Sequence, residues 1–111
     1  MKKTLLTLAT IIAIAGPVLA QSITTIADAQ RGTMVTLQGT VDRITDEDEF
    51  HLRDASGWIE VDVGPNWVPV EVGEQVTLQG FVDDDFGPRE VYARSLTRAD
   101  GTVITFDRRD D

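Results

Sequence analysis

The chain has 111 residues, which favours a single domain, and it contains no cysteine, so disulfide bonds are excluded and a structural zinc site is disfavoured. Its formal net charge is −9 at pH 7, and such a surface repels the phosphate backbone of nucleic acids. Composition therefore disfavours nucleic-acid binding and favours cationic or basic partners, with simple solubility as the alternative explanation of the charge.

Residues 1–20 have the pattern of a secretory signal peptide. Lys2 and Lys3 precede an apolar run from Leu5 to Ala15, and short residues before Ala20 suit cleavage after that residue. The run is too short to span a bilayer, so we expect a secreted chain without a membrane span after cleavage; an uncleaved anchor is the alternative. Cleavage removes two of the 10 basic residues and none of the 19 acidic ones, which gives a net charge of about −11.

Residues 21–32 predict a short helix that leads into the rest of the chain. Its residues run from Ser22 to Arg31, with Thr25 as the capping residue and Asp28 three positions later. Gly32 is expected to end it.

Residues 33–106 show the pattern of β-strands, because apolar and polar residues alternate between turn-forming segments. The charged segment 45–49 is expected to be a hairpin loop, and 83–88 a second acidic turn. Residues 107–111 should form a frayed tail. The strands are predicted at 33–42, 50–54, 58–63, 75–82, 89–96 and, as a short last strand, 103–106.

The sequence Val-Thr-Leu-Gln-Gly occurs twice, at 35–39 and at 76–80. Two copies are too few for a repeat array, and both fall in predicted strands that precede an acidic turn. Gly39 and Gly80 occupy the same inward position, where a glycine permits a sharp bend or a close backbone approach. The two copies are therefore predicted to be the first and fourth strands of one barrel, whether or not a duplication produced them.

Five main strands in so short a chain predict an all-β fold, a small closed barrel, with an open sandwich as the alternative. The order of elements resembles the five-stranded Greek-key barrel of the OB-fold. It is similar, more narrowly, to the bacterial periplasmic OB-fold (BOF) family of the stress-tolerance type. The stretches that carry the resemblance are Thr-Ile-Ala-Asp-Ala at 25–29, both glycine-containing strands, and the segment Phe-His-Leu-Arg-Asp-Ala-Ser-Gly-Trp-Ile-Glu-Val-Asp-Val at 50–63.

The resemblance implies a periplasmic protein linked to envelope stress. It implies a barrel without the usual nucleic-acid determinants and a ligand that is small, ionic or glycan-like. It supplies no catalytic residues. The segment 64–73 is richer in proline than the family pattern.

The two acidic turns are expected to flank the binding face of such a barrel. Their carboxylates would then converge on one rim, where a divalent cation could bind weakly, or a polyamine or basic peptide could bind instead. The alternative is two solvated turns that keep the surface polar. No tightly bound cofactor is expected. The rim residues are Asp46, Glu47, Asp48, Glu49, Asp83, Asp84 and Asp85.

The outer face of the second and third strands is the second candidate site. Trp58 would stack on a sugar or base, and Arg53 would pair with an anionic group. The alternative is an ordinary amphipathic sheet face. The predicted face residues are His51, Arg53, Trp58, Glu60 and Asp62, extended by Phe81 and Tyr92.

Trp67 lies between two prolines and is expected to plug one end of the barrel, rather than to serve as a recognition aromatic. Catalysis is not expected. His51 is the sole histidine, Ser56 lies outside a nucleophile elbow, and the paired carboxylates fall in exposed turns, where their pKa values should not be driven apart.

The predicted function is therefore a non-enzymatic binding or stress-tolerance module of the periplasm, whose partner is a small molecule, a cation, a glycan or a basic peptide. Single-stranded nucleic-acid binding is the runner-up, through a thin set of aromatic and arginine side chains that includes Arg94. A protein-interaction role is the third possibility. The sequence does not predict the oligomeric state.

Overall fold

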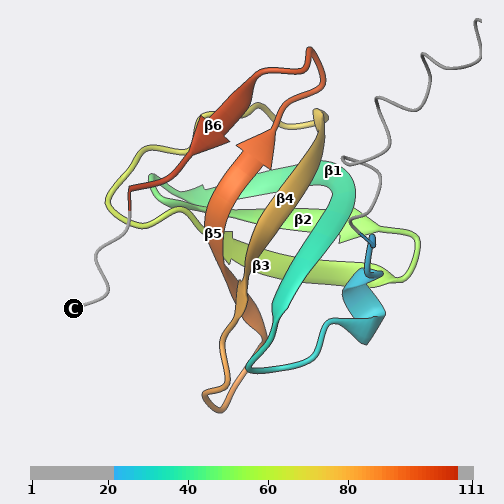
Figure 1. Ribbon diagram of the computed structural model, residues 1–111. Coiled ribbons are helices and arrows are strands. Elements are labelled where there is room, and N and C mark those ends of the chain that lie inside the picture. Colours follow the sequence, from blue (N-terminus) through green and yellow to red (C-terminus); the bar gives the residue numbers. More distant parts are fainter. Residues whose placement is uncertain (1–21, 108–111) are drawn as a thin grey trace, which may run out of the picture.

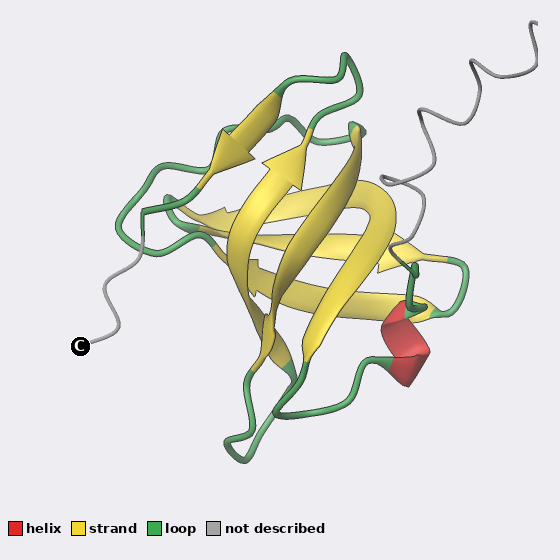
Figure 2. Ribbon diagram, viewed as in Figure 1, coloured by secondary structure: helices red, strands yellow, loops and turns green. Residues whose placement is uncertain are grey.

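The computed structural model describes residues 22–107, so the predicted signal peptide and residues 108–111 of the predicted tail lie outside the described residues. The described chain forms a strongly curved sheet with strand order β3-β2-β1-β4-β5-β6 (Figure 1, Figure 2). The strands are β1 (Met34–Asp46), β2 (Glu49–Asp54), β3 (Gly57–Asp62), β4 (Gln75–Val82), β5 (Glu90–Thr97) and β6 (Val103–Thr105).

The barrel closes where β3 lies parallel to β5. Three residue pairs form this seam, from Glu60 opposite Glu90 to Asp62 opposite Tyr92. The remaining neighbours among β1–β5 are antiparallel, and β6 adds to the far end of β5. The prediction of a five-stranded OB-fold barrel is confirmed, and the open-sandwich alternative is wrong because β3 and β5 pair.

β1 serves both halves of the barrel because it bends in its middle. Residues 34–40 of β1 pair with β4, and residues 40–46 pair with β2. A Cβ atom at Gly39 would lie 2.5 Å from the carbonyl oxygen of Arg53, and one at Gly80 would lie 2.6 Å from that of Tyr92. Both glycines are therefore required by a close backbone approach, as the sequence predicted.

The two Val-Thr-Leu-Gln-Gly copies pair with each other. Leu37 lies opposite Leu78 at the centre, with Val35 opposite Gly80 and Gly39 opposite Val76 at the two ends. Because the two segments are identical and antiparallel, they are related by a local two-fold axis. Each residue of one copy therefore faces the same residue type as its equivalent in the other copy. The predicted placement in the first and fourth strands is confirmed.

The barrel interior is filled by the apolar residues that alternate along the strands. Phe50 and Leu52 of β2 and Ile59 and Val61 of β3 are at most 1% exposed, as are Leu37, Val41 and Leu78. One contiguous core results, and it comprises Ile26, Ala29, Leu37, Val41, Phe50, Leu52, Ile59, Val61, Val63, Val70, Val76, Leu78, Val82, Val91, Ala93, Leu96 and Phe106.

The predicted helix at 22–31 is reduced to one 3-10 turn, η2 (Ile26–Asp28), and Thr25 makes no side-chain cap. Tertiary contacts take its backbone groups: Asp54 accepts the Ile26 amide at 2.9 Å, and Arg89 donates to the Ile26 and Ala29 carbonyls at 2.7 Å. These bonds compete with those of a longer helix. Within residues 22–107, no helix is long and apolar enough to cross a membrane.

The predicted loop at 45–49 is also shorter in the structure. β1 continues to Asp46 and β2 begins at Glu49, so the turn is limited to residues 47 and 48. Asp46 pairs with Glu49 across the hairpin, and the Asp46 side chain accepts the amide of Glu47 at 2.8 Å. Strand pairing therefore continues through acidic residues that were predicted to lie in the loop.

Near the C-terminus, β5 and β6 each end within one residue of the predicted position.

Trp67 is 75% exposed, so the prediction that it plugs one end of the barrel is wrong. Val70 and Phe106 are buried instead, and Val68 packs against the core. The Val68 amide donates to the carbonyl of Glu47 at 2.8 Å, which holds the segment against the β1–β2 turn. The valines of this proline-rich connection therefore cover the core, and the tryptophan faces solvent.

Candidate functional site

The predicted face residues all lie outside the core, on neighbouring strands. β2 and β3 supply five of them, and Phe81 and Tyr92 stand opposite each other on β4 and β5. Asp62 stands opposite Tyr92 across the β3–β5 seam. The seam therefore joins the two halves of the predicted face into one continuous surface.

Two aromatic rings mark one end of this face. The rings of His51 and Trp58 stack, with centroids 4.3 Å apart and an interplanar angle of 24°. They lie on a diagonal of the β2–β3 ladder, since His51 is opposite Glu60 and Trp58 is opposite Arg53. Trp58 remains 51% exposed, so part of its ring surface is open to a ligand.

Arg53 is held by a neighbouring acid rather than aimed at the aromatic pair. Its Nε donates to Oδ1 of Asp42 at 3.1 Å. Both side chains are substantially exposed, so solvent screens the ion pair and its effect on stability is small. An anionic ligand would therefore compete with Asp42 for this guanidinium.

A group of carboxylates occupies the centre of the face, over the seam that closes the barrel. Oxygen atoms of Glu49, Asp62 and Glu90 lie within 4.8 Å of one another. Glu60 joins them through a side-chain hydrogen bond with Glu49, and it accepts the Thr45 hydroxyl at 3.5 Å. We call Glu49, Glu60, Asp62 and Glu90 the carboxylate cluster.

The surroundings of Glu49 favour its protonated form. The hydrogen bond to Glu60, partial burial, and the negative charges of Glu60, Glu90 and Asp48 together raise the pKa of Glu49 to about 7. The expectation that carboxylates of this turn would keep ordinary pKa values is therefore wrong for Glu49. Its place in strand β2, instead of in a solvated loop, is the physical reason.

Glu90 and Tyr92 respond to the same environment. Burial, then the charges of Asp62, Glu60 and Asp83, raises the pKa of Glu90. Burial and neighbouring acids also raise the pKa of Tyr92. Glu90 was absent from the predicted site. Its position two residues before Tyr92, on the same outward face of a strand, was the available signal.

The predicted rim does not gather at one point. Asp46, Asp48 and Glu49 form one group, and the three consecutive aspartates of the β4–β5 loop form another. Glu47 belongs to neither group; its backbone carbonyl instead accepts the Val68 amide. The carboxylate cluster is connected to both rim groups. Glu49 belongs to the cluster and to the first rim group, and the negative charge of Asp83 in the second rim group helps to raise the pKa of Glu90.

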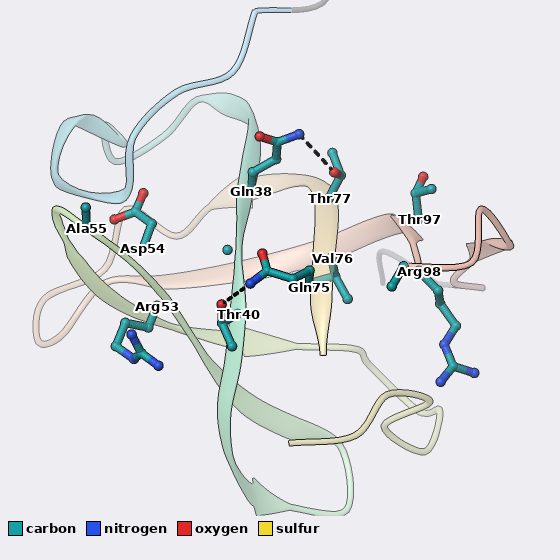
Figure 3. Close-up of a pocket in the computed structure, with 12 residues that line it drawn as sticks. Gln38, Thr40, Arg53, Asp54, Ala55, Gln75, Val76, Thr77, Thr97 and Arg98 are labelled. Carbon is teal, nitrogen blue, oxygen red and sulfur yellow. Dashed lines mark hydrogen bonds between the residues drawn. The ribbon is translucent and has the colours of Figure 1, made fainter. Parts of the chain in front are cut away.

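A separate polar groove of about 690 Å³ lies on the outside of β1 and β4, near the bend at Gly39. Figure 3 shows Gln38 donating to the Thr77 hydroxyl at 3.4 Å and Gln75 donating to the Thr40 hydroxyl at 2.8 Å. None of the carboxylate cluster lines this groove. Sequence reasoning missed it, because it depends on the curvature of β1.

Arg98, which lines the margin of this groove, forms an ion pair with Glu74. Its Nε and Nη2 atoms donate to the two carboxylate oxygens at 2.8 and 2.9 Å. This forked contact lowers the pKa of Glu74 to about 2. The pair joins the start of β4 to the end of β5, so its role in the structure is to hold these strand ends together.

Residues 15–98 match the sequence model of the family described as bacterial OB fold (BOF) protein. The chain belongs to the BOF family. A curated relative is protein YgiW of Escherichia coli K12, which is 37% identical over 84 residues, or 69% of this chain. The aligned part spans 64% of the length of YgiW.

Two solved structures share the fold of this barrel. The structure of the hypothetical protein YgiW from E. coli matches with a TM-score of 0.62 and 31% identity, over 72% of this chain and 92% of that one. The telomere capping protein Ten1 from Saccharomyces pombe matches with a TM-score of 0.56 and 20% identity, over 74% and 84% of the two chains. At that identity, the second match concerns the fold alone.

Proposed function

We propose that this BOF chain is a non-enzymatic binding module of the periplasm, active in stress tolerance, that holds a small cationic or glycan-like ligand on the face formed by β2, β3 and β5. The observation that carries the proposal is the carboxylate cluster at the centre of that face. A cation that replaces the shared proton would relieve the repulsion among its members.

An organic amine fits this surface better than a bare metal ion. The carboxylates are bordered by the His51–Trp58 stack on one side and by Tyr92 on the other. Aromatic faces attract ammonium groups, and carboxylates accept their hydrogen bonds. A polyamine or a lysine- or arginine-rich peptide therefore suits the combination, while Ca²⁺ would use the oxygen atoms alone. A sugar ring would use the open face of Trp58.

The two rim groups contribute at longer range. The β1–β2 turn and the β4–β5 loop each carry several exposed acids beside the cluster. Like charges at the edges of a site raise the local concentration of counter-ions and speed their association. The attraction should weaken as salt rises.

A ligand screen by thermal unfolding tests the proposal. Calcium chloride, spermidine, a muropeptide and a single-stranded oligonucleotide are each added at matched ionic strength, because a ligand that binds the folded state raises its apparent stability. We expect spermidine to raise the unfolding temperature of the natural chain and to have less effect on a Glu60→Gln, Glu90→Gln double variant. Equal effects on both would place its binding elsewhere.

Nucleic-acid binding is the alternative for an OB-fold, but the charge argues against it. Affinity for a phosphate backbone depends on lysine and arginine contacts. Here Arg53 pairs with Asp42, and acidic residues surround the aromatic side chains of the face. Salt-sensitive binding of single-stranded DNA in a gel shift at low salt would favour the alternative over our proposal.

The periplasmic location is part of the same proposal and has its own test. It rests on the charged start, the apolar run and the short residues that end at Ala20. Cell fractionation should recover the mature chain with the periplasmic proteins, and N-terminal sequencing should begin at Gln21. A chain that retains Met1 and stays with the cytoplasmic fraction would contradict it.

A further inference from the structure

The tip of the β4–β5 loop presents a fully exposed aromatic side chain. Phe86 has a relative exposure of 103%, which is the highest of the exposed large apolar residues in the described chain. Exposing a phenylalanine costs free energy that burial against a partner would recover. The carboxylate cluster, which the proposed function uses, does not include this residue.

A guanidinium bridges the two residues on either side of the loop tip. Arg31 donates from Nη1 to the carbonyl of Asp85 and from Nη2 to the carbonyl of Gly87, both at 2.6 Å. These two carbonyls flank Phe86 in the chain. The Gly32 amide also donates to the carbonyl of Val82 at 2.7 Å, which ties the N-terminal segment to the base of the loop.

This brace has a consequence for binding. A flexible loop would lose conformational freedom when it docked, and that loss would weaken the complex. Here the ordering is achieved within the folded chain, by a guanidinium that holds both neighbours of the aromatic residue. Phe86 therefore has the properties of a pre-organised anchor, of the kind that dominates binding energy at protein interfaces.

The charge around the anchor indicates what it meets. Three consecutive aspartates, Asp83 to Asp85, precede Phe86 and lie together in one acidic group. Bilayer surfaces that carry anionic lipids repel such a group. A second copy of the chain is also a poor fit, because it carries the same excess of acidic residues, with a net charge of −9.

We propose that Phe86 is the anchor of a protein–protein interface, whose partner is a protein with an apolar pocket bordered by lysine or arginine side chains. The aromatic ring would enter the pocket, and the three aspartates would face its basic border. Phe86 itself lies outside the carboxylate cluster, although the three aspartates also belong to the acidic rim beside that cluster. The two proposals are therefore separated by variants of Phe86.

Site-specific photo-crosslinking tests the interface. Phe86 is replaced by p-benzoylphenylalanine in the full chain, expressed from its own gene, and cells are irradiated. The same probe at Trp67, also an exposed aromatic position, is the matched control. We expect a discrete protein adduct from position 86 and not from position 67, with the cross-linked partner residue in an apolar pocket beside lysine or arginine.

Two further variants test the roles of the aspartates and of Arg31. Replacing the three aspartates by asparagine keeps a side-chain oxygen for the Asp85 amide, which Asp83 binds at 3.1 Å, but removes the charge. Arg31→Gln weakens the brace without touching the tip. Both should lower the adduct yield several-fold. With the purified partner, Phe86→Ala should weaken binding by about tenfold or more, and should leave spermidine binding unchanged.

Several results would overturn the proposal. They are adducts with lipid only, an adduct with a second copy of this chain, the same adduct from position 67, and no discrete adduct. An adduct yield that is unchanged when the three aspartates become asparagines would show that the partner's pocket has no basic border. If the natural chain does not bind spermidine but position 86 still gives the protein adduct, only the proposed cation site is contradicted. The two proposals can therefore fail separately.

Discussion

Glu49 on β2 and Glu60 on β3 share a side-chain hydrogen bond although both are acids. That contact favours a shared proton, and together with partial burial and the neighbouring negative charges it raises the pKa of Glu49 to about 7. Glu90 and Asp62 lie on the strands that close the barrel, so ionisation of the cluster affects the seam as well as the proposed site.

Stability should fall as pH rises through neutrality. The pKa of Glu49 is raised from its ordinary value of 4.5 to about 7 in the folded chain, so its contribution is complete below pH 4.5 and is lost as pH passes 7. Between pH 5 and pH 8 we expect a loss on the order of 1 kcal/mol, because solvent screens a partly exposed group. Urea unfolding at several pH values measures it.

Glu49→Gln is the control for that experiment. The amide cannot titrate, so the decline between pH 5 and pH 8 should flatten in the variant. Glu90, whose pKa is also raised, should leave a smaller residual slope of the same sign. A variant with the slope of the natural chain would show that Glu49 does not hold the proton.

Gly39→Ala should destabilise the barrel. The added Cβ would lie 2.5 Å from a backbone oxygen of Arg53, and the backbone must shift to relieve the clash. We expect a cost of about 1–3 kcal/mol, typical of an overpacked interior. Gln38→Ala, on the exposed side of the same strand, is the matched control. Thermal unfolding in which both variants match the natural chain would refute the close approach.

Asp54→Ala should release η2 from the barrel. The Asp54 carboxylate accepts the amides of Ile26 at 2.9 Å, Ser56 at 2.7 Å and Gly57 at 3.2 Å. Burial opposes its ionisation, but these donors and the Ser56 hydroxyl lower its pKa overall. We expect a loss of about 1–3 kcal/mol and faster hydrogen exchange at the Ile26 amide. Unchanged hydrogen exchange at the Ile26 amide would show that Asp54 does not hold η2 against the barrel.

Trp58→Ala should weaken ligand binding and leave the fold intact. The residue is 51% exposed and stacks on His51 at the surface, so its loss opens no cavity in the core. Far-ultraviolet circular dichroism and the unfolding temperature check the fold. Trp67→Phe leaves Trp58 as the sole tryptophan, so a change of its fluorescence on adding spermidine would report contact with the face. Collapse of Trp58→Ala would make it a structural residue.

The barrel was predictable because its evidence is local. Alternation along 75–82 marked β4 without error, and the repeated glycine-ended segment marked the two strands that require a close backbone approach. The predicted helix failed because its backbone partners, Asp54 and Arg89, are distant in sequence. Capping patterns describe a segment alone, and they cannot anticipate side chains that a folded barrel brings to it.

The proposed site could be predicted from the sequence as a sheet face, but the carboxylate cluster within it could not. Period-two alternation places His51, Trp58, Glu60 and Asp62 on the outside of one hairpin. Glu90 joins them only across the parallel seam, where the register between β3 and β5 decides which residues meet. Trp67 was misplaced for a similar reason, since the pairing of Val68 with Glu47 determines which side of the connection faces the core.

Binding at the carboxylate cluster can be tested by titrating the isotopically labelled chain with spermidine and recording amide NMR spectra at pH 8. We expect saturable shifts at His51, Glu60, Asp62, Glu90 and Tyr92, and little change at Gln38 and Thr77 in the polar groove. Binding should be weaker at pH 5.5, because Glu49 is then protonated. Shifts confined to the groove, or affinity that is equal at the two pH values, would contradict binding at the carboxylate cluster.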